Sequence, residues 1–135
     1  MAPIQTVLAI AAAENLEIHQ IDIKGAYLNG ELTDNERIYM KQPPRYPVSP
    51  NSSDVLLLLK MLYSLKQAGR HWYQKLVEIM EALGFERCDV DQAMCYRKKG
   101  STLIIVLVHV DDCTIAGTSI TLIHRFKIKN FFFFF

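Results

Sequence analysis

The chain has 135 residues, half of them hydrophobic, and its Lys and Arg nearly balance its Asp and Glu, leaving a net charge of +1. This length suffices for a domain with a hydrophobic core, and the charge balance neither indicates nor excludes a nucleic-acid partner. The three cysteines (Cys88, Cys95 and Cys113) form no CxxC pair, which argues against a zinc site or a disulfide framework and for a reducing compartment. No signal peptide is found, and no apolar run reaches the ~18 residues of a membrane span, so no membrane partner is expected.

The first part of the chain predicts one helix followed by short strands. Pro3 and the Ala-rich run after it are typical of a helix that ends near Asn15. Residues 16–23 predict a strand in which Ile21 and Ile23 lie on the face opposite Asp22. The segments that follow are short: a turn or short helix over 24–30, a strand over 38–40, and irregular structure over the proline-rich 43–53.

The middle of the chain predicts a second buried strand over residues 55–62 (VLLLLKML) and then an amphipathic helix. The apolar face of that helix has residues at helical spacing, namely Trp72, Leu76, Ile79, Met80 and Leu83. Gly84 is a natural residue to follow its end. Residues 121–129 resemble the beginning of a further helix that does not develop.

Within residues 102–117 (TLIIVLVHVDDCTIAG), the run before the two acids predicts the central strand, buried on both faces, because it is apolar and rich in β-branched side chains. A buried helix is the competing interpretation. Residues 93–97, turning at Lys98-Lys99-Gly100, pair with this strand as a hairpin. The resulting order of elements predicts an α+β fold, with a layer of helices packed on one face of a mostly antiparallel sheet.

Two adjacent carboxylates, Asp111 and Asp112, end the central strand, and we expect them in the turn of a second hairpin. The simple interpretation is a polar turn; the alternative is a divalent-cation site, since carboxylate oxygens at a strand end suit Mg²⁺, with Mn²⁺ as a substitute. Asp22, also at a strand end, would decide between them if its strand were a neighbour. Three such acids could hold two metal ions about 3.5–4 Å apart for phosphoryl transfer. A nucleotide-sugar transferase acting through Mn²⁺ is a further hypothesis, resting on the acidic turn alone.

Four ordered blocks of the sequence resemble copia-type retrotransposon reverse transcriptases over roughly residues 4–127. They are IDIKGAYLNGEL (21–32), IYMKQPP (38–44), LKMLYSLKQAGRHWYQKL (59–76) and LIIVLVHVDDCTIAG (103–117). The resemblance implies a truncated polymerase palm over residues 3–129, with fingers and thumb absent, and a Phe-rich tail over 130–135 without assigned function. It implies catalytic metal ligands at Asp22, Asp111 and Asp112.

The resemblance also implies the partners of the site. Tyr27 matches the aromatic that excludes a ribose 2′-hydroxyl, Gln67 matches the glutamine that contacts the incoming nucleotide, and Lys66 and Arg70 would meet phosphates. The implied partners are a primed RNA or DNA template, deoxynucleoside triphosphates, and the integrase and RNase H segments of the same polyprotein. The implied location is the cytoplasm, in particles of the parent element, or the nucleus.

Three positions depart from the family pattern. His109 stands where a Tyr usually precedes x-Asp-Asp, Ser64 replaces a usual Gly, and Gly69 replaces a usual Pro. His109 lies near the primer end in the implied site, so this departure bears on full activity rather than on metal binding. Ser64 and Gly69 could loosen the turn before the amphipathic helix. A catalytically inactive remnant of a transposable element is therefore the alternative to an active polymerase fragment.

Overall fold

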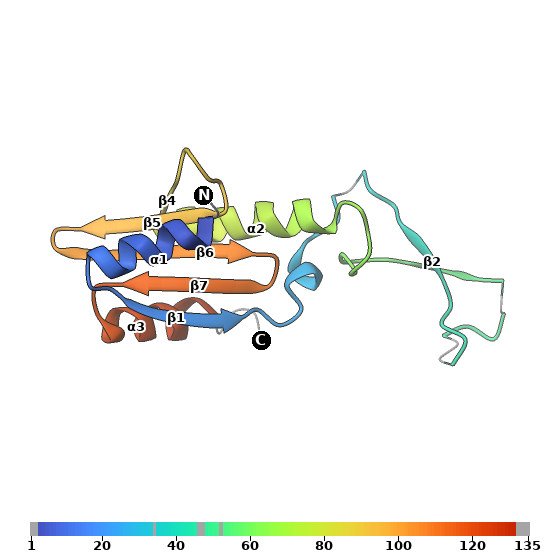
Figure 1. The fold of residues 1–135 in the computed structure, drawn as a ribbon. Helices are drawn as coiled ribbons and strands as arrows, with labels where there is room; N and C mark the ends of the chain where they lie inside the picture. The colour runs from blue at the N-terminus through green and yellow to red at the C-terminus, as the bar shows by residue number, and fades with distance from the viewer. Residues whose placement is uncertain (1–2, 34, 46–47, 52, 132–135) are drawn as a thin grey trace. The chain divides into compact units, whose positions relative to one another are not determined.

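The computed structural model describes residues 3–33, 35–45, 48–51 and 53–131. Its described residues divide into two compact units, one within residues 1–26 and 76–135 and the other within residues 27–75. Figure 1 shows the elements of both. Within the described residues no helix is both long enough and apolar enough to cross a membrane.

The first unit is built on a five-stranded sheet of order β1-β7-β6-β5-β4, in which every pair of neighbours is antiparallel. The strands are β1 (Glu17–Asp22), β4 (Glu86–Arg87), β5 (Met94–Lys99), β6 (Thr102–His109) and β7 (Asp112–Gly117). Residues 104–107 of the central strand β6 are all buried, which confirms the prediction of a strand with two covered faces. The β5–β6 turn falls at Gly100 and Ser101, slightly later than predicted.

One face of this sheet is covered by α1 (Pro3–Ala13), which ends, as predicted, before Asn15. Val7 and Ala11, one helical turn apart, pack in a cluster with Ile105, Leu107 and Ala116. Because side chains alternate along a strand, these β6 and β7 residues all belong to the same face. The helix stabilises the sheet by removing this apolar face from water.

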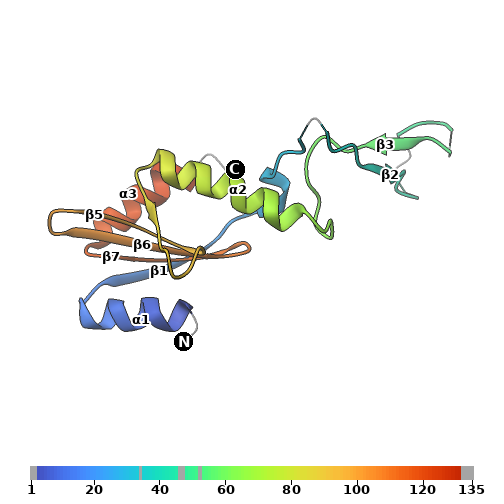
Figure 2. The same cartoon turned by 90° about the horizontal axis from the view of Figure 1, so that it is seen from above.

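The opposite face of the sheet is covered by α3 (Ile120–Phe131) and by the C-terminal part of α2 (Ala68–Ala82), as Figure 2 shows. Phe85, just after α2, packs on Phe126 of α3 with ring centroids 5.3 Å apart. Helices therefore lie on both faces, and the prediction of helices on one face is wrong. The reason is that β6 is apolar on both faces, with Ile104 and Val106 buried on one and Ile105 and Leu107 on the other.

The helix that the sequence pattern left undeveloped is complete in the structure. Ser119 caps it, since its hydroxyl oxygen accepts a hydrogen bond from the Leu122 backbone N–H at 3.2 Å. Ile123 and Phe126, three residues apart, are buried. The segment has apolar residues at helical spacing, and the helix is stabilised because these residues pack on a sheet face that only the folded chain supplies.

The second unit holds a short 3₁₀ helix η1 (Ala26–Asn29), a two-stranded ribbon of β2 (Tyr39–Lys41) and β3 (Val55–Leu57), and the start of α2. The predicted buried strand over 55–62 is wrong in length and in burial. Val55 is 54% exposed and Leu59 82%, and β3 pairs only with β2. An apolar run predicts burial only if another layer covers it, and among the described residues none covers this face of the ribbon.

The amphipathic helix α2 matches its prediction closely. Trp72, Leu76 and Met80 are each at most 5% exposed. Gly84 follows it with φ of +75°, and the Phe85 backbone N–H donates to the Met80 carbonyl at 3.0 Å, as in a glycine-terminated helix end.

Candidate active site

The pairing of β1 with β7 brings Asp22 opposite Asp112 at one end of the sheet. The backbone N–H of Ile23 donates to the carbonyl of Asp111 at 2.8 Å. With this bond, Asp22 and Asp112 form the closer, non-hydrogen-bonded kind of antiparallel pair, in which Cα atoms lie about 4.5 Å apart. The neighbouring strands that the metal hypothesis required are therefore present.

Asp111 lies in the turn that joins β6 to β7, and Asp112 is the first residue of β7. The predicted hairpin is confirmed, although only the first acid of the pair occupies its turn. Val110, the other turn residue, has φ of +61°, a conformation that β-branched residues rarely adopt. The β5–β6 hairpin also has a two-residue turn whose first residue has a positive φ, and in that turn the first residue is Gly100.

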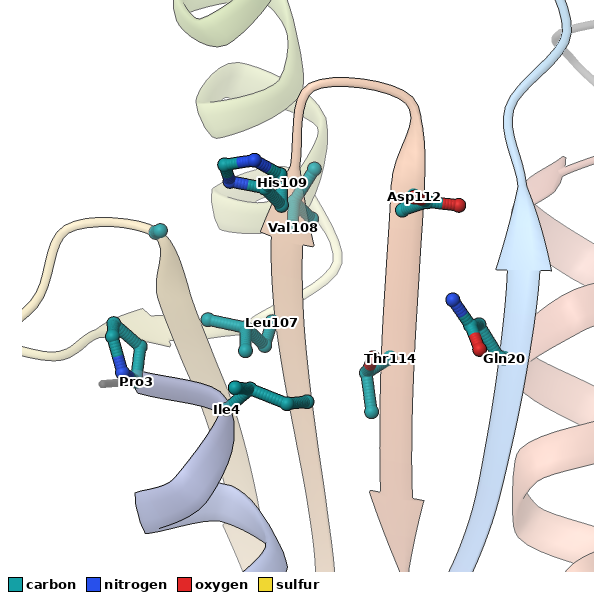
Figure 3. A pocket seen from close by; sticks show the side chains of 9 residues that line it. Pro3, Ile4, Gln20, Leu107, Val108, His109, Asp112 and Thr114 are labelled. Carbon is teal, nitrogen blue, oxygen red and sulfur yellow. The ribbon is translucent and has the colours of Figure 1, made fainter. Parts of the chain in front are cut away.

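Asp22 and Asp112 share one sheet face with a row of polar side chains. His109 and Asp22 are each paired with Asp112 in the sheet. The side chains of all three therefore lie on one face, the same face that α1 covers further along the strands. In the next row Thr114 pairs with Leu107 and with Gln20. Between these rows and the start of α1 lies a pocket of about 410 Å³, shown in Figure 3, where the Asp112 side chain extends toward β1.

This end of the sheet is accessible to solvent, since Asp22, His109 and Asp112 are exposed and Asp111 is half-buried. Two like charges directly opposite each other on a sheet are destabilising unless a cation lies between them. Among the described residues no group of three or more His, Cys, Asp or Glu side chains is arranged to hold a metal ion. The donor set nevertheless fits Mg²⁺, which binds through one or two carboxylates and completes its shell with water and substrate oxygens.

The other residues singled out by the sequence belong to the second unit, around the start of α2. Tyr27 lies on η1, and its hydroxyl oxygen lies 3.5 Å from the position that a Cβ at residue 69 would take. Gln67 immediately precedes α2, and its carbonyl accepts a hydrogen bond from the His71 N–H at 3.1 Å. Lys66 and Arg70 are exposed, and neither forms an ion pair with another described residue.

The charges of the chain are divided unevenly between the two units. The segment 27–75 contains seven Lys and Arg against four Asp and Glu, a net charge of +3, whereas the remaining residues contain eight against ten, a net charge of −2. Within the basic segment His71 contacts Glu36 at 3.0 Å, and hydrogen bonds from Thr33 hold the pKa of Glu36 below its usual value. Such a basic segment suits phosphate-bearing ligands.

Two features of the second unit were not singled out as functional by the sequence. Tyr63 packs against Tyr27, and Ser64 has φ of +75°, in the left-handed region that favours glycine. The family's usual Gly at position 64 was the available signal for the second feature. The contact of Tyr63 with Tyr27 had no such signal, because the two residues lie far apart in the sequence.

A family model described as reverse transcriptase (RNA-dependent DNA polymerase) matches residues 1–132. The chain is 36% identical to the retrovirus-related Pol polyprotein from transposon RE1 of Arabidopsis thaliana and 38% identical to that from transposon TNT 1-94 of Nicotiana tabacum, in each case over 94% of the chain. These stretches are only 9% and 10% of the two polyproteins. A putative transposon Ty5-1 protein of Saccharomyces cerevisiae is 32% identical over 79% of the chain and 34% of its own length. No solved structure matches the chain.

With the family model covering almost the whole chain, the protein belongs to the reverse transcriptase family, in its copia-type branch. The predicted resemblance is thereby confirmed. The chain spans about a tenth of the length of the two plant polyproteins it matches.

Proposed function

We propose that the chain is the palm part of an RNA-directed DNA polymerase that adds deoxynucleotides to the 3′-hydroxyl of a primer. The observation that carries the proposal is the register of β1 and β7, which sets Asp22 opposite Asp112 with Asp111 on the adjoining turn. Carboxylates on neighbouring strands at an accessible end of a sheet suit the two-metal arrangement for in-line phosphoryl transfer. Family membership supports the same chemistry.

In this proposal Asp22, Asp111 and Asp112 hold divalent cations, Mg²⁺ by preference and Mn²⁺ as a substitute. Bound there, such cations supply positive charge that stabilises the attacking and leaving oxygens. Tyr27 contacts the sugar of the incoming nucleotide, and Gln67 contacts the nucleotide itself. Lys66 and Arg70 bind its phosphates, which is consistent with their exposure and with the net positive charge of segment 27–75.

The proposed partners are a primed RNA or DNA template, deoxynucleoside triphosphates, and the integrase and RNase H segments of the parent polyprotein. The support for the last of these is that the plant relatives are Pol polyproteins about ten times longer than the aligned stretch. We propose that the parent protein acts in the cytoplasm, inside particles of the element, or in the nucleus.

Primer extension by the purified chain tests the proposal. With Mg²⁺, a primed template and deoxynucleotides, we expect extension by the unchanged chain and a loss on the order of a hundredfold or more in Asp22→Asn and Asp112→Asn, because each removes a metal ligand. Asp89→Asn, at an exposed acid in the loop after β4, is the matched control and should retain extension. Undiminished extension by Asp112→Asn would refute the catalytic assignment.

A second readout does not depend on activity. Without divalent cations, Asp22→Asn should stabilise the chain by about 0.2–1 kcal/mol, because it removes one of two opposed carboxylates. Adding Mg²⁺ should raise the unfolding temperature of the unchanged chain and have less effect on the variant. An Mg²⁺ effect equal in both proteins would show that Asp22 does not bind the ion.

A folded remnant without enzymatic role is the alternative function. It is favoured by the lack of a three-residue metal cluster among the described residues and by His109 at the position where the family usually has Tyr. This alternative predicts no primer extension and no Mg²⁺-dependent change in unfolding temperature. If His109 is the single substitution that impairs the site, His109→Tyr should restore primer extension. If the chain has been inactivated at many positions, His109→Tyr should not restore it.

A further inference from the structure

The ring of Tyr27 is supported on two sides by residues near the start of α2. Its centroid lies 4.9 Å from that of Tyr63, with the two ring planes tilted by 35°. Its hydroxyl oxygen lies beside the backbone of Gly69, in the first turn of the helix. Aromatic pairs at this separation are attractive beyond the area they bury, so Tyr63 restrains the orientation of Tyr27.

Tyr63 lies in a turn whose next residue has a left-handed backbone conformation. Ser64 adopts φ of +75°, which is costly for a residue other than glycine. The bend continues into the helix through a hydrogen bond from the Ala68 N–H to the Leu65 carbonyl at 3.1 Å. Tyr63 itself remains 44% exposed, so burial in a core does not account for its position. Strained backbone that holds one side chain in place is typical of functional segments.

We propose that Tyr63 is a positioning residue that fixes the ring of Tyr27 and thereby sets the discrimination between deoxyribonucleotides and ribonucleotides. The inference rests on the proposed function, in which Tyr27 contacts the sugar. To exclude one hydroxyl group, the ring must be fixed in position to within a fraction of the size of an oxygen atom, because a small rotation of the ring would leave room for the hydroxyl. Tyr27 alone, on a single turn of 3₁₀ helix, is held by few contacts of its own.

The position of Gly69 offers an independent way to tighten the same support. A Cβ at this position would meet the Tyr27 hydroxyl oxygen at 3.5 Å, an ordinary contact distance, and no closer atom. Gly69→Ala should therefore place a methyl group against Tyr27 without a clash. We expect this variant to retain or increase the discrimination, the opposite of what removing Tyr63 does.

The experiment compares incorporation of one deoxynucleotide and one ribonucleotide by the 135-residue chain on a primed template with Mg²⁺. In Tyr63→Ala the ratio of ribonucleotide to deoxynucleotide efficiency should rise by about fivefold, the factor expected for losing one aromatic pair. Tyr63→Phe keeps the ring and should restore the original ratio. Tyr39→Ala, at an exposed tyrosine without a ring contact to another described residue, is the matched control and should leave the ratio unchanged.

The outcomes separate this inference from the proposed function. A relative gain of ribonucleotide use cannot come from partial unfolding, which lowers both efficiencies together. If Tyr27→Ala raises the ratio and Tyr63→Ala does not, the positioning role is refuted while the assignment of Tyr27 stands. If neither variant changes the ratio, the role of Tyr27 is refuted and this inference with it. If the unchanged chain incorporates no nucleotide, the proposed function itself is refuted.

Discussion

The turn at Val110 allows the clearest test of how the backbone is strained beside the candidate site. Val110 and Gly100 occupy the same position in two-residue hairpin turns of one sheet, with φ of +61° and +57°. A left-handed φ costs an L-residue roughly 1–2 kcal/mol, whereas glycine adopts it freely. Replacing Val110→Gly removes this strain, but it adds about 0.5–1 kcal/mol of chain entropy to the unfolded state and loses the contacts of a side chain that is 41% exposed. We expect a net stabilisation of about 0.5 kcal/mol.

The reverse substitution, Gly100→Val, is the matched control. A Cβ at Gly100 would meet no atom within 4 Å, so its effect comes from the backbone alone. We expect destabilisation by about 1 kcal/mol, the strain less the entropy lost by the unfolded chain. Urea unfolding followed by circular dichroism measures both, provided that the dependence of the free energy on urea is unchanged. If Val110→Gly is destabilising, or Gly100→Val neutral, then left-handed backbone is not the source of strain in these turns.

Three further predictions concern other parts of the chain. Ser64→Gly should raise the free energy of unfolding by about 0.5–1 kcal/mol in a urea titration, because it relieves a left-handed φ; a loss of stability would show that the serine side chain compensates for it. The pKa of His19 is held below 6.5 by burial, by Lys127 and by a neighbouring imidazole. The contribution of His19 to stability is therefore complete above pH 6.5 and falls as the pH drops below that value. His19→Gln should flatten the pH dependence of the unfolding midpoint between pH 7.5 and 5.5. Burial raises the pKa of Cys113 to about 12, so at pH 8 iodoacetamide should modify the half-buried Cys88 of the native chain first, and mass spectrometry showing rapid modification of Cys113 would contradict its burial.

Segments with a strong local pattern were predictable from the sequence. The spacing of Trp72, Leu76 and Met80 predicted α2 and its buried face, since a helix brings residues four apart onto one side. The β-branched run around Ile104 and Val106 predicted a buried central strand. In both cases the periodicity of the backbone itself determines which side chains lie together.

Segments whose burial depends on distant parts of the chain were not predictable. The run from Val55 to Leu59 is apolar enough for a core strand, yet only Val55–Leu57 forms a strand, in a two-stranded ribbon. The helix α3 is amphipathic, but it is stabilised by the packing of Ile123 and Phe126 on an apolar sheet face that the local sequence does not reveal. Likewise, alternation along β6 and β7 shows that both faces are apolar but not which helix covers each one.

For the candidate site, the sequence by itself determined the family and predicted the three acids, because both depend on residue types in a fixed order. It could not place Asp22 beside Asp112, since these residues lie far apart in the chain and a strand carries no local record of its neighbour. Only the tertiary structure decided that, through the hydrogen-bonded register of β1 on β7. The structure alone also placed Tyr63 against Tyr27, because a contact between a 3₁₀ helix and a distant turn depends on how the backbone folds between them.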